Sequence, residues 1–417
     1  MRIAYITQSY PPMVSGASIV ANNLAENMVA RGHKVLVIAA SDRGKSYKSI
    51  NGNLAILRLR SYHNPLRVGQ KFILSPRHAF LHALQDFQPD LIHTHDALQL
   101  GIFSLIYQRK QKIPVVLTVH ALPNFVAEYI PAVFPSFRST IETSLWMYAR
   151  LILPQFDTVI TPTPTTSEMI FSMTKVQPLS ISNGVDLDTF NPVHLTQDHE
   201  LALRAQYNLP PHVPIILHVG RLDTDKGVEQ VIMAAAQAMR TTDAHLLMVG
   251  DGRQKSALLK LCKTLGIERR CHFPGYISIE EGLPDIYRLS NLFVTASEIE
   301  TQGIVLLEAA ASGLPIVAVK TTCIPEIVRD GLNGCLAEPK DINALAKGIA
   351  NLLKNSEGAK MMGQVGRLLV NEHNISTTFN SYEQLYAGLI KQKTTLPLPE
   401  RAIIHKWQER AKDWLNL

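Results

Sequence analysis

Short apolar runs that end in polar or glycine-containing segments recur along the chain, and they limit which folds it can adopt. Residues 3–6 (IAYI) and 34–39 (KVLVIA) are predicted to be buried strands on either side of a helix over 16–31. Strands that alternate with helices in this way are typical of βαβ units, whose strands pair in parallel. Similar strand and helix signals follow at 89–98, 113–123, 156–163, 214–239, 245–252, 271–278 and 315–320. The pattern predicts an α/β protein with open parallel sheets.

The size and composition narrow the class of protein. A chain of 417 residues is long enough for about two to three domains. A hydrophobic content of 46% with 18% charged residues is typical of a soluble globular protein and excludes a disordered chain. No apolar run reaches the roughly 18 residues of a transmembrane helix. The N-terminus lacks a signal peptide's apolar core, and the four cysteines lack C-x-x-C spacing, so we expect a cytoplasmic protein with reduced thiols.

Positive charge is concentrated in the first part of the chain. Residues 1–190 contain 17 Lys and Arg against 11 Asp and Glu, whereas residues 191–417 contain 24 of each. Nucleic acid is one explanation for such an excess. Against it, the sequence has no helix-turn-helix signal, no metal finger and no basic run interleaved with aromatic residues. An anionic membrane surface or simple solubility explains the charge equally well, and we expect no nucleic-acid partner.

The stretch 297–315, SEIETQGIVLLEAAASGLP, combines two acids with a glycine and a helix signal. Gly303 separates Glu300, on a predicted loop, from Glu308, inside a predicted helix that ends before Pro315. The unpaired N–H groups at the start of that helix would attract an anion. A carboxylate among apolar neighbours, as at Glu308, needs a partner. The layout suits an anion flanked by two hydroxylated rings, as in a nucleotide-sugar, although a solvent-exposed loop before a core helix is the simpler interpretation.

Other polar side chains follow predicted strands, where ligands of open parallel sheets gather. His95 and Asp96 follow one strand and His120 follows another, although a single histidine is more often structural. Gly16 lies in the first strand-to-helix turn and would let backbone approach a ligand closely. Arg221 and Lys226 flank the turn that opens the second half, and two cations there suit a diphosphate.

Two segments allow more than one interpretation. Residues 124–156 hold many aromatics, among them Phe125 and Trp146, and a helix predicted from Ile141 is either a core helix or an interfacial segment that reaches an apolar acceptor. The Asp-x-Asp pairs at 186–188 and 223–225 are interpreted as turn chemistry, because a metal site needs more carboxylates. We therefore expect no cofactor and no essential metal ion.

Several motifs together resemble glycosyltransferase family 4. They are S-E-x-E-x-x-G-x-x-x-L-E-A-x-A-x-G-x-P-I-V-A from Ser297, G-R-L-x-x-x-K-G from Gly220, N-G-V-D-x-x-x-F from Asn183 and T-x-H ending at His120. The resemblance covers nearly the whole chain and is strongest over 214–334. It implies the retaining GT-B architecture: two doubly wound Rossmann-like domains that face each other across a cleft.

The resemblance also implies domain limits and residue roles. Residues 1–190 would bind the acceptor, residues 191–380 the nucleotide-sugar, and residues 381–417 would form a helical tail that packs back on the first domain. The expected catalytic residues are His120, Arg221, Lys226 and Glu300. The expected donor-binding residues are Gly16, Gly220, Arg221, Lys226, Gly252, Tyr276, Glu300, Gly303, Ile304 and Glu308. On the acceptor side we expect Asp96, Phe125 and Trp146.

The loop form Glu-Thr-Gln-Gly at 300–303 departs from the commoner Glu-x-Phe-Gly and resembles that of bacterial diacylglycerol glucosyltransferases. It favours transfer of glucose from UDP-glucose to diacylglycerol by a protein peripheral to the inner face of the cell membrane. The alternatives are a mannosyl- or glucosyltransferase with a soluble or phosphatidylinositol-type acceptor, and a nucleotide-sugar-binding protein without activity.

Overall fold

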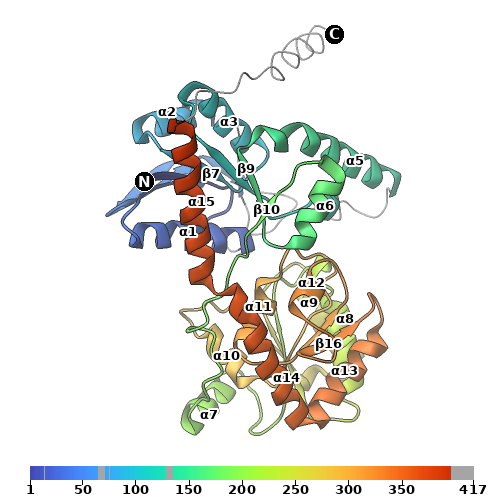
Figure 1. The fold of residues 1–417 in the computed structure, drawn as a ribbon. Coiled ribbons are helices and arrows are strands. Elements are labelled where there is room, and N and C mark those ends of the chain that lie inside the picture. The colour runs from blue at the N-terminus through green and yellow to red at the C-terminus, as the bar shows by residue number, and fades with distance from the viewer. Residues whose placement is uncertain (14, 64–70, 75, 128–134, 396–417) are drawn as a thin grey trace.

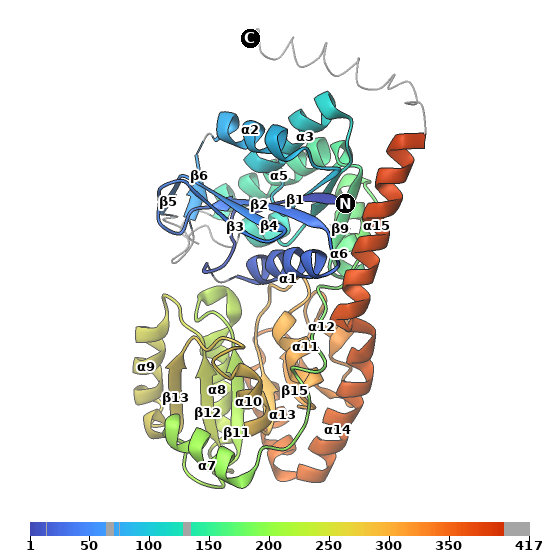
Figure 2. The ribbon, with the colours of Figure 1, turned by 90° about the vertical axis from the view of Figure 1, so that its left-hand side faces the viewer.

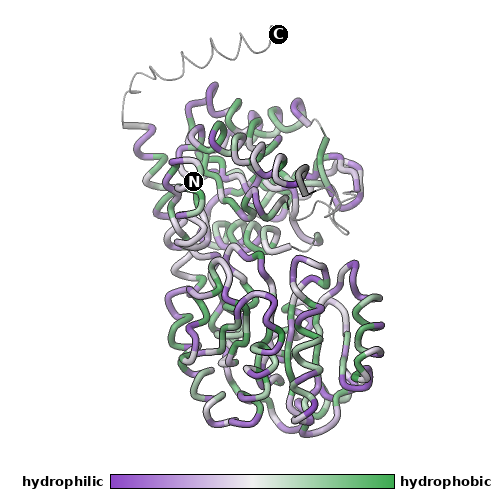
Figure 3. Tube along the Cα trace, turned by 90° about the vertical axis from the view of Figure 1, so that its right-hand side faces the viewer, coloured by the Kyte–Doolittle hydropathy of each residue, from purple (hydrophilic) through white to green (hydrophobic). Residues whose placement is uncertain are grey.

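The chain folds into two α/β domains that are stacked along one axis (Figure 1). The computed structural model describes residues 1–13, 15–63, 71–74, 76–127 and 135–395. Apolar segments gather in the interior of each domain, and hydrophilic segments lie mainly at outer turns (Figure 3).

The first domain is built on an eight-stranded sheet in the order β10-β9-β8-β7-β1-β2-β4-β3, parallel except for β3. Its strands are β1 (Arg2–Ile6), β2 (Lys34–Ala40), β3 (Tyr47–Asn51), β4 (Leu54–Leu59), β7 (Leu91–Thr94), β8 (Val115–Thr118), β9 (Thr158–Thr161) and β10 (Leu179–Ser180). β5 (Ser61–His63) and β6 (Lys71–Ile73) form a small antiparallel pair. The helices are α1 (Gly16–Ala30), α2 (Arg77–Phe87), α3 (Gln99–Gln111), α4 (Pro123–Ala127), α5 (Pro135–Ile152) and α6 (Pro164–Thr174).

Helices cover both faces of this sheet because its strands are apolar on both sides. Along β1, Ile3 and Tyr5 belong to one buried apolar cluster, whereas Ala4 and Ile6 belong to another. Successive side chains of a strand point to opposite faces, so the two clusters are the two sides of the sheet. This explains the unbroken apolar runs that predicted the strands.

The second domain has a six-stranded parallel sheet in the order β13-β12-β11-β14-β15-β16 around one large apolar core. Its strands are β11 (Ile215–Val219), β12 (His245–Val249), β13 (Cys271–Gly275), β14 (Leu292–Val294), β15 (Ile316–Val319) and β16 (Gly334–Ala337). The helices are α7 (Gln197–Gln206), α8 (Val228–Ala238), α9 (Lys255–Thr264), α10 (Leu283–Leu289), α11 (Ile304–Ala311), α12 (Ile324–Ile327), α13 (Ile342–Lys354) and α14 (Ser356–Leu369).

Both sheets reverse their strand order at one point. In the first sheet the reversal lies between β1 and β7, and in the second it lies between β11 and β14. Loops that follow two such neighbouring strands diverge to opposite faces and leave room for a ligand at the carboxyl edge. Ligand-binding side chains are therefore expected after these four strands.

The last described helix, α15 (Ile375–Thr395), returns from the second domain and lies along the first (Figure 2). Its Tyr382 and Tyr386 are fully buried in the apolar cluster that contains Ile3 and Tyr5. The helix begins before residue 381, so the return to the first domain starts earlier than the predicted tail. The tail beyond residue 395, with Trp407 and Trp414, lies outside the described residues.

Local predictions agree with the structure in most places. Helix α1 ends at Ala30, one residue before the predicted end, and Thr163 caps α6 by accepting a hydrogen bond from the Thr166 N–H. The helix predicted from Ile141 begins earlier, at Pro135. The four cysteines are unpaired. Within the described residues, no helix combines the length and the apolarity needed to cross a bilayer.

Candidate active site

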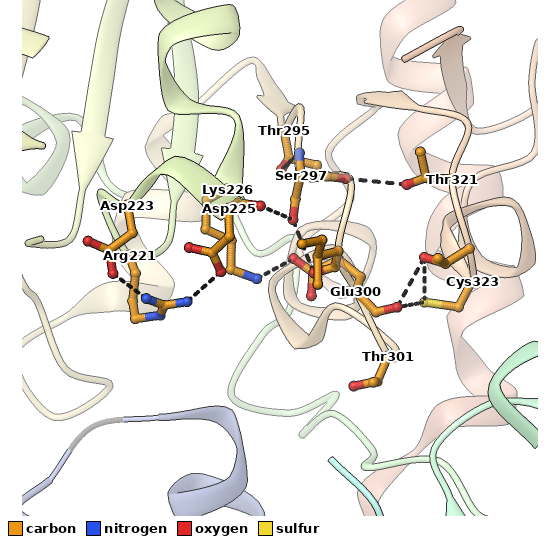
Figure 4. A network of polar contacts seen from close by, with 12 residues as sticks. Arg221, Asp223, Asp225, Lys226, Thr295, Ser297, Glu300, Thr301, Thr321 and Cys323 are labelled. Carbon is orange, nitrogen blue, oxygen red and sulfur yellow. Dashed lines mark hydrogen bonds and ion pairs between the residues drawn. The ribbon is translucent and has the colours of Figure 1, made fainter. Parts of the chain in front are cut away.

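The strand-order reversal of the second sheet carries a close ion pair. Lys226 ends the turn after β11, and Glu300 lies on the loop after β14. The Lys226 ammonium lies 2.6 Å from a Glu300 carboxylate oxygen (Figure 4). Gly227 makes this approach possible, because a Cβ at that position would lie 2.2 Å from the Ala296 carbonyl oxygen. The topology thus brings together two side chains that are 74 positions apart.

Arg221 lies beside this pair, and its positive charge is also balanced by carboxylates. Its guanidinium contacts the carboxylates of Asp223 and Asp225, the latter at 2.6 Å (Figure 4). Asp223 also lies 3.7 Å from the Arg253 side chain. Asp223 and Asp225, interpreted from the sequence as turn chemistry, are thus both partners of Arg221. The available signal was the presence of acids two and four positions after the arginine, since both can reach back to the same guanidinium.

The loop that carries Glu300 is anchored within its own domain and leads into a helix. The Glu300 carbonyl accepts hydrogen bonds from the Thr322 hydroxyl at 3.0 Å and the Cys323 thiol at 3.3 Å. Gly303 adopts a left-handed conformation with φ of 79°, which turns the chain into α11 at Ile304, as predicted. The first N–H groups of a helix lack intrahelical partners, so the start of α11 can receive an anion.

Glu308 has the partner that its apolar surroundings require. Its side chain is buried, and its carboxylate accepts a hydrogen bond of 2.7 Å from the Tyr287 hydroxyl. Burial raises the pKa of Glu308 to about 7. The carboxyl is therefore poised between its protonated and ionised forms at neutral pH.

His120 of the first domain contacts the loop that carries Glu300. It follows β8, and its carbonyl accepts a hydrogen bond of 3.3 Å from the hydroxyl of Thr301, the neighbour of Glu300. The His120 ring is stacked on His95, with Nε2 2.7 Å from His95 Nδ1. Burial lowers the pKa of His120 to about 4, so the imidazole is neutral at neutral pH. His95 and His120, each predicted to follow a strand, are thus in contact, and His95 is the partner that orients His120.

The glycine turn at the start of α1 faces the start of α11. A Cβ placed on Gly16 would lie 3.8 Å from the Ile304 side chain, and Ile304 packs against an apolar cluster of the first domain. Helix α1 lies on the side of the first domain that faces the second domain (Figure 2). The two helix starts predicted to approach a donor phosphate therefore lie next to each other.

The turns that hold Gly220 and Gly252 pack on each other at the same edge of the second sheet. The Gly220 N–H donates to the Val249 carbonyl and the Leu222 N–H to the Asp251 carbonyl, each at 3.0 Å. Tyr276 follows the next strand and is 52% exposed, so it is free to contact a ligand.

The three acceptor-side candidates have structural roles. Asp96 is buried and accepts a hydrogen bond of 2.7 Å from the Leu98 N–H at the start of α3. Phe125 and Trp146 belong to a buried apolar cluster of the first domain. Trp146 also lines a surface hollow of about 240 Å³ on α5, next to Met147 and Arg150. Contact of these residues with an acceptor stays a prediction.

No group of three or more His, Cys, Asp or Glu side chains within the described residues could hold a metal ion. That the reaction needs no metal ion stays a prediction.

Two family models match consecutive parts of the chain. "Glycosyltransferase Family 4" matches residues 14–189, and "Glycosyl transferases group 1" matches residues 200–369. The chain is 27% identical over 81% of its length to an alpha-monoglucosyldiacylglycerol synthase of Streptococcus pneumoniae, of which it covers 75%. It is 26% identical over 91% of its length to an N-acetyl-alpha-D-glucosaminyl L-malate synthase of Bacillus anthracis, of which it covers 96%.

A solved structure is similar throughout. Sucrose-phosphate synthase from Thermosynechococcus elongatus superimposes with a TM-score of 0.78 and 26% identity, covering 94% of this chain and 99% of that one. The two family models and this similar structure together define a glycosyltransferase of GT-B architecture. Within that class, the chain belongs to glycosyltransferase family 4.

Proposed function

We propose that this glycosyltransferase moves a hexose from a nucleoside-diphosphate sugar to a hydroxyl group and keeps the anomeric configuration. The observation that carries the proposal is the meeting of Lys226, Glu300 and the start of α11 with the first-domain residue His120. Cations and a helix start suit the diphosphate, while a carboxylate and a neutral imidazole suit sugar hydroxyls.

Each residue has a role in this proposal. Arg221, Lys226 and the N-terminus of α11 stabilise the negative charge that grows on the leaving diphosphate. Glu300 accepts hydrogen bonds from hydroxyls of the donor sugar, and Glu308 accepts from the ribose. Since Lys226 and Glu300 contact each other at 2.6 Å, a bound donor would insert between them or bridge them.

The reaction needs no protein nucleophile in this proposal. The bond between the anomeric carbon and the diphosphate oxygen breaks, and the acceptor oxygen bonds to that carbon on the same face. The acceptor proton passes to the leaving phosphate oxygen. His120 contacts the transferred sugar near the reacting carbon, and its neutral form leaves it able to hydrogen-bond without adding charge.

For the substrates we propose UDP-glucose as donor and diacylglycerol as acceptor, at the inner face of the cell membrane. Three observations support this choice: the Glu-Thr-Gln-Gly loop, the relative named as a monoglucosyldiacylglycerol synthase, and the positive charge of residues 1–190. The outer side of α5 adds exposed apolar side chains, Met147 at 57% and Leu151 at 55%. Basic residues near an anionic surface each contribute about 1 kcal/mol to attraction.

A thermal-shift panel of UDP-, GDP- and ADP-sugars tests the donor, because a ligand at 100 times its dissociation constant adds about 2.7 kcal/mol of stability. Vesicle flotation and transfer of labelled glucose, with and without anionic lipid, test the acceptor. Absence of vesicle binding would contradict the lipid acceptor.

A soluble acceptor is the second candidate, and the relative named as an N-acetylglucosaminyl malate synthase favours it. Transfer to small hydroxy acids or sugars, without vesicles, separates it from the lipid acceptor. Slow cleavage of the nucleotide-sugar by water distinguishes either enzyme from a binding protein without activity.

A further inference from the structure

Thr301 and Gln302 lie on the loop that carries Glu300 in the second domain. They connect this loop to the first domain and to residues 182–185, where the chain first passes between the domains. The Thr301 hydroxyl donates to the His120 carbonyl at 3.3 Å, and the Thr301 carbonyl accepts from the Thr163 hydroxyl at 3.0 Å. In Figure 4, the Thr301 side chain lies apart from the ion pair of Lys226 and Glu300. Thr301 therefore contacts the first domain while its neighbour Glu300 contacts the second.

Gln302 is 1% exposed, and both ends of its amide are bonded. Its Oε1 accepts from the Asn183 N–H at 2.8 Å, and its Nε2 donates to the Ser182 hydroxyl at 2.8 Å. A buried amide with both partners satisfied is held in one orientation, and loss of either partner is costly. An apolar side chain at this position would offer neither a donor nor an acceptor.

Ser182 and Asn183 belong to the first crossing of the chain between the domains, and this crossing pairs with the second. The Val185 N–H donates to the His373 carbonyl at 2.9 Å, and the Ile375 N–H donates to the Val185 carbonyl at 3.0 Å. The Ser182 hydroxyl lies 3.0 Å from His373 Nδ1. Any rotation of one domain against the other must change the dihedral angles here, and Gln302 is bonded to this point.

We propose that Thr301 and Gln302 are positioning residues that form an interdomain clasp, which holds His120 and Glu300 at a fixed separation on either side of the transferred sugar. The inference rests on the proposed function. Glu300 is fixed in the second domain by Lys226 and by its carbonyl bonds. The clasp fixes the same loop to the first domain, through the bond of Thr301 to His120. Turnover then depends on the clasp, whereas binding of a nucleoside diphosphate, whose contacts we propose mainly in the second domain, does not.

Single substitutions separate an effect on turnover from an effect on binding of the nucleoside diphosphate. Thr301→Val removes the hydroxyl that reaches His120, and Thr301→Ser keeps it. Thr321→Val is the matched control, because the Thr321 hydroxyl makes a bond of the same 3.3 Å length to the Ser297 carbonyl within the second domain. Gln302→Leu removes both amide bonds at similar volume. The measurements are UDP-glucose turnover, the dissociation constant of UDP, and hydrogen exchange of the Asn183 amide.

We expect Thr301→Val and Gln302→Leu to lower turnover by about tenfold or more, since small misplacements of reacting groups are costly. Thr301→Ser and Thr321→Val stay within about twofold of wild type, and UDP affinity changes by less than about threefold in every variant. The Asn183 amide exchanges faster in Gln302→Leu alone. Equal turnover in Thr301→Val and Thr321→Val, or a parallel loss of turnover and UDP affinity, would overturn the clasp.

The test is separate from that of the proposed function. If the wild-type chain neither binds nor cleaves UDP-, GDP- or ADP-sugars, the proposed function is wrong. Exchange of the Asn183 amide in Gln302→Leu then decides whether the clasp exists. If Gln302→Leu unfolds, the comparison of Thr301→Val with Thr301→Ser decides the question, because it changes one partly exposed hydroxyl.

Discussion

The ammonium of Lys226 lies 2.6 Å from the carboxylate of Glu300, at the point where the second sheet reverses its strand order. The Lys226 side chain is 21% exposed and that of Glu300 is 15% exposed. The pair is thus partly shielded from water, which strengthens its interaction with a charged ligand. The nearby Arg221 is also engaged, so the cations predicted to meet a diphosphate are held in place by acids.

Replacement of either cation should impair the reaction. We expect Lys226→Ala and Arg221→Ala each to lower turnover by about two orders of magnitude or more, because charge on the leaving diphosphate loses its stabilisation. Steady-state release of the nucleoside diphosphate measures this. Lys393→Ala is the control, since Lys393 forms a pair of similar exposure with Asp157 in the first domain. Wild-type rates in either site variant would end the assignment.

Donor affinity should depend on the protonation of Glu308. Its pKa is about 7 in the folded protein, above the ordinary 4.5, because it is buried. A ribose hydroxyl bonds best to the ionised form, so the affinity for UDP-glucose should rise by up to about tenfold from about pH 6 to about pH 8. Isothermal titration calorimetry measures this.

Glu308→Gln is the control and should bind with little pH dependence. His120 and His218 do not interfere, because burial lowers each pKa to about 4. The same carboxyl contributes to stability most fully below pH 4.5, and this contribution is lost as the pH rises through about 7. A pH dependence that persists in Glu308→Gln would assign the titration to another group.

Removal of metal ions should leave turnover unchanged. The proposed stabilisation of the leaving group comes from Arg221, Lys226 and the start of α11, so a chelator such as EDTA removes nothing that the reaction needs. The rate is measured before and after dialysis against EDTA, and again after addition of Mg²⁺ or Mn²⁺. A loss that either ion restores would show that the chain needs a metal to hold the diphosphate.

The hydroxyl of Tyr386 should stabilise the contact of α15 with the first domain. It lies 2.6 Å from His93 Nδ1 and 3.2 Å from the Tyr5 hydroxyl, all buried. Tyr386→Phe keeps the packing but leaves buried polar groups without a partner, which costs about 1–3 kcal/mol. Urea unfolding measures the change. Tyr62→Phe, at a side chain that is 41% exposed, serves as the control and should change little.

The alternation of strands and helices could be predicted from the sequence because it depends on local signals. The apolar run 34–39 and the helix that follows Gly303 are set by side chains within a few positions of each other. The positions of Arg221 and Lys226 after a strand could be predicted for the same reason. The partners of these residues were not, because periodicity carries no information about which loops meet.

The sequence by itself determined the two α/β domains, the helix start at Ile304 and the need of Glu308 for a partner. Only the tertiary structure decided that Lys226 contacts Glu300, that Tyr287 supplies that partner, and that Thr301 reaches His120 across 181 positions. The physical reason is that these contacts depend on strand order and on the packing of one domain against the other. Both are collective properties of the folded chain, and no short stretch of residues encodes them.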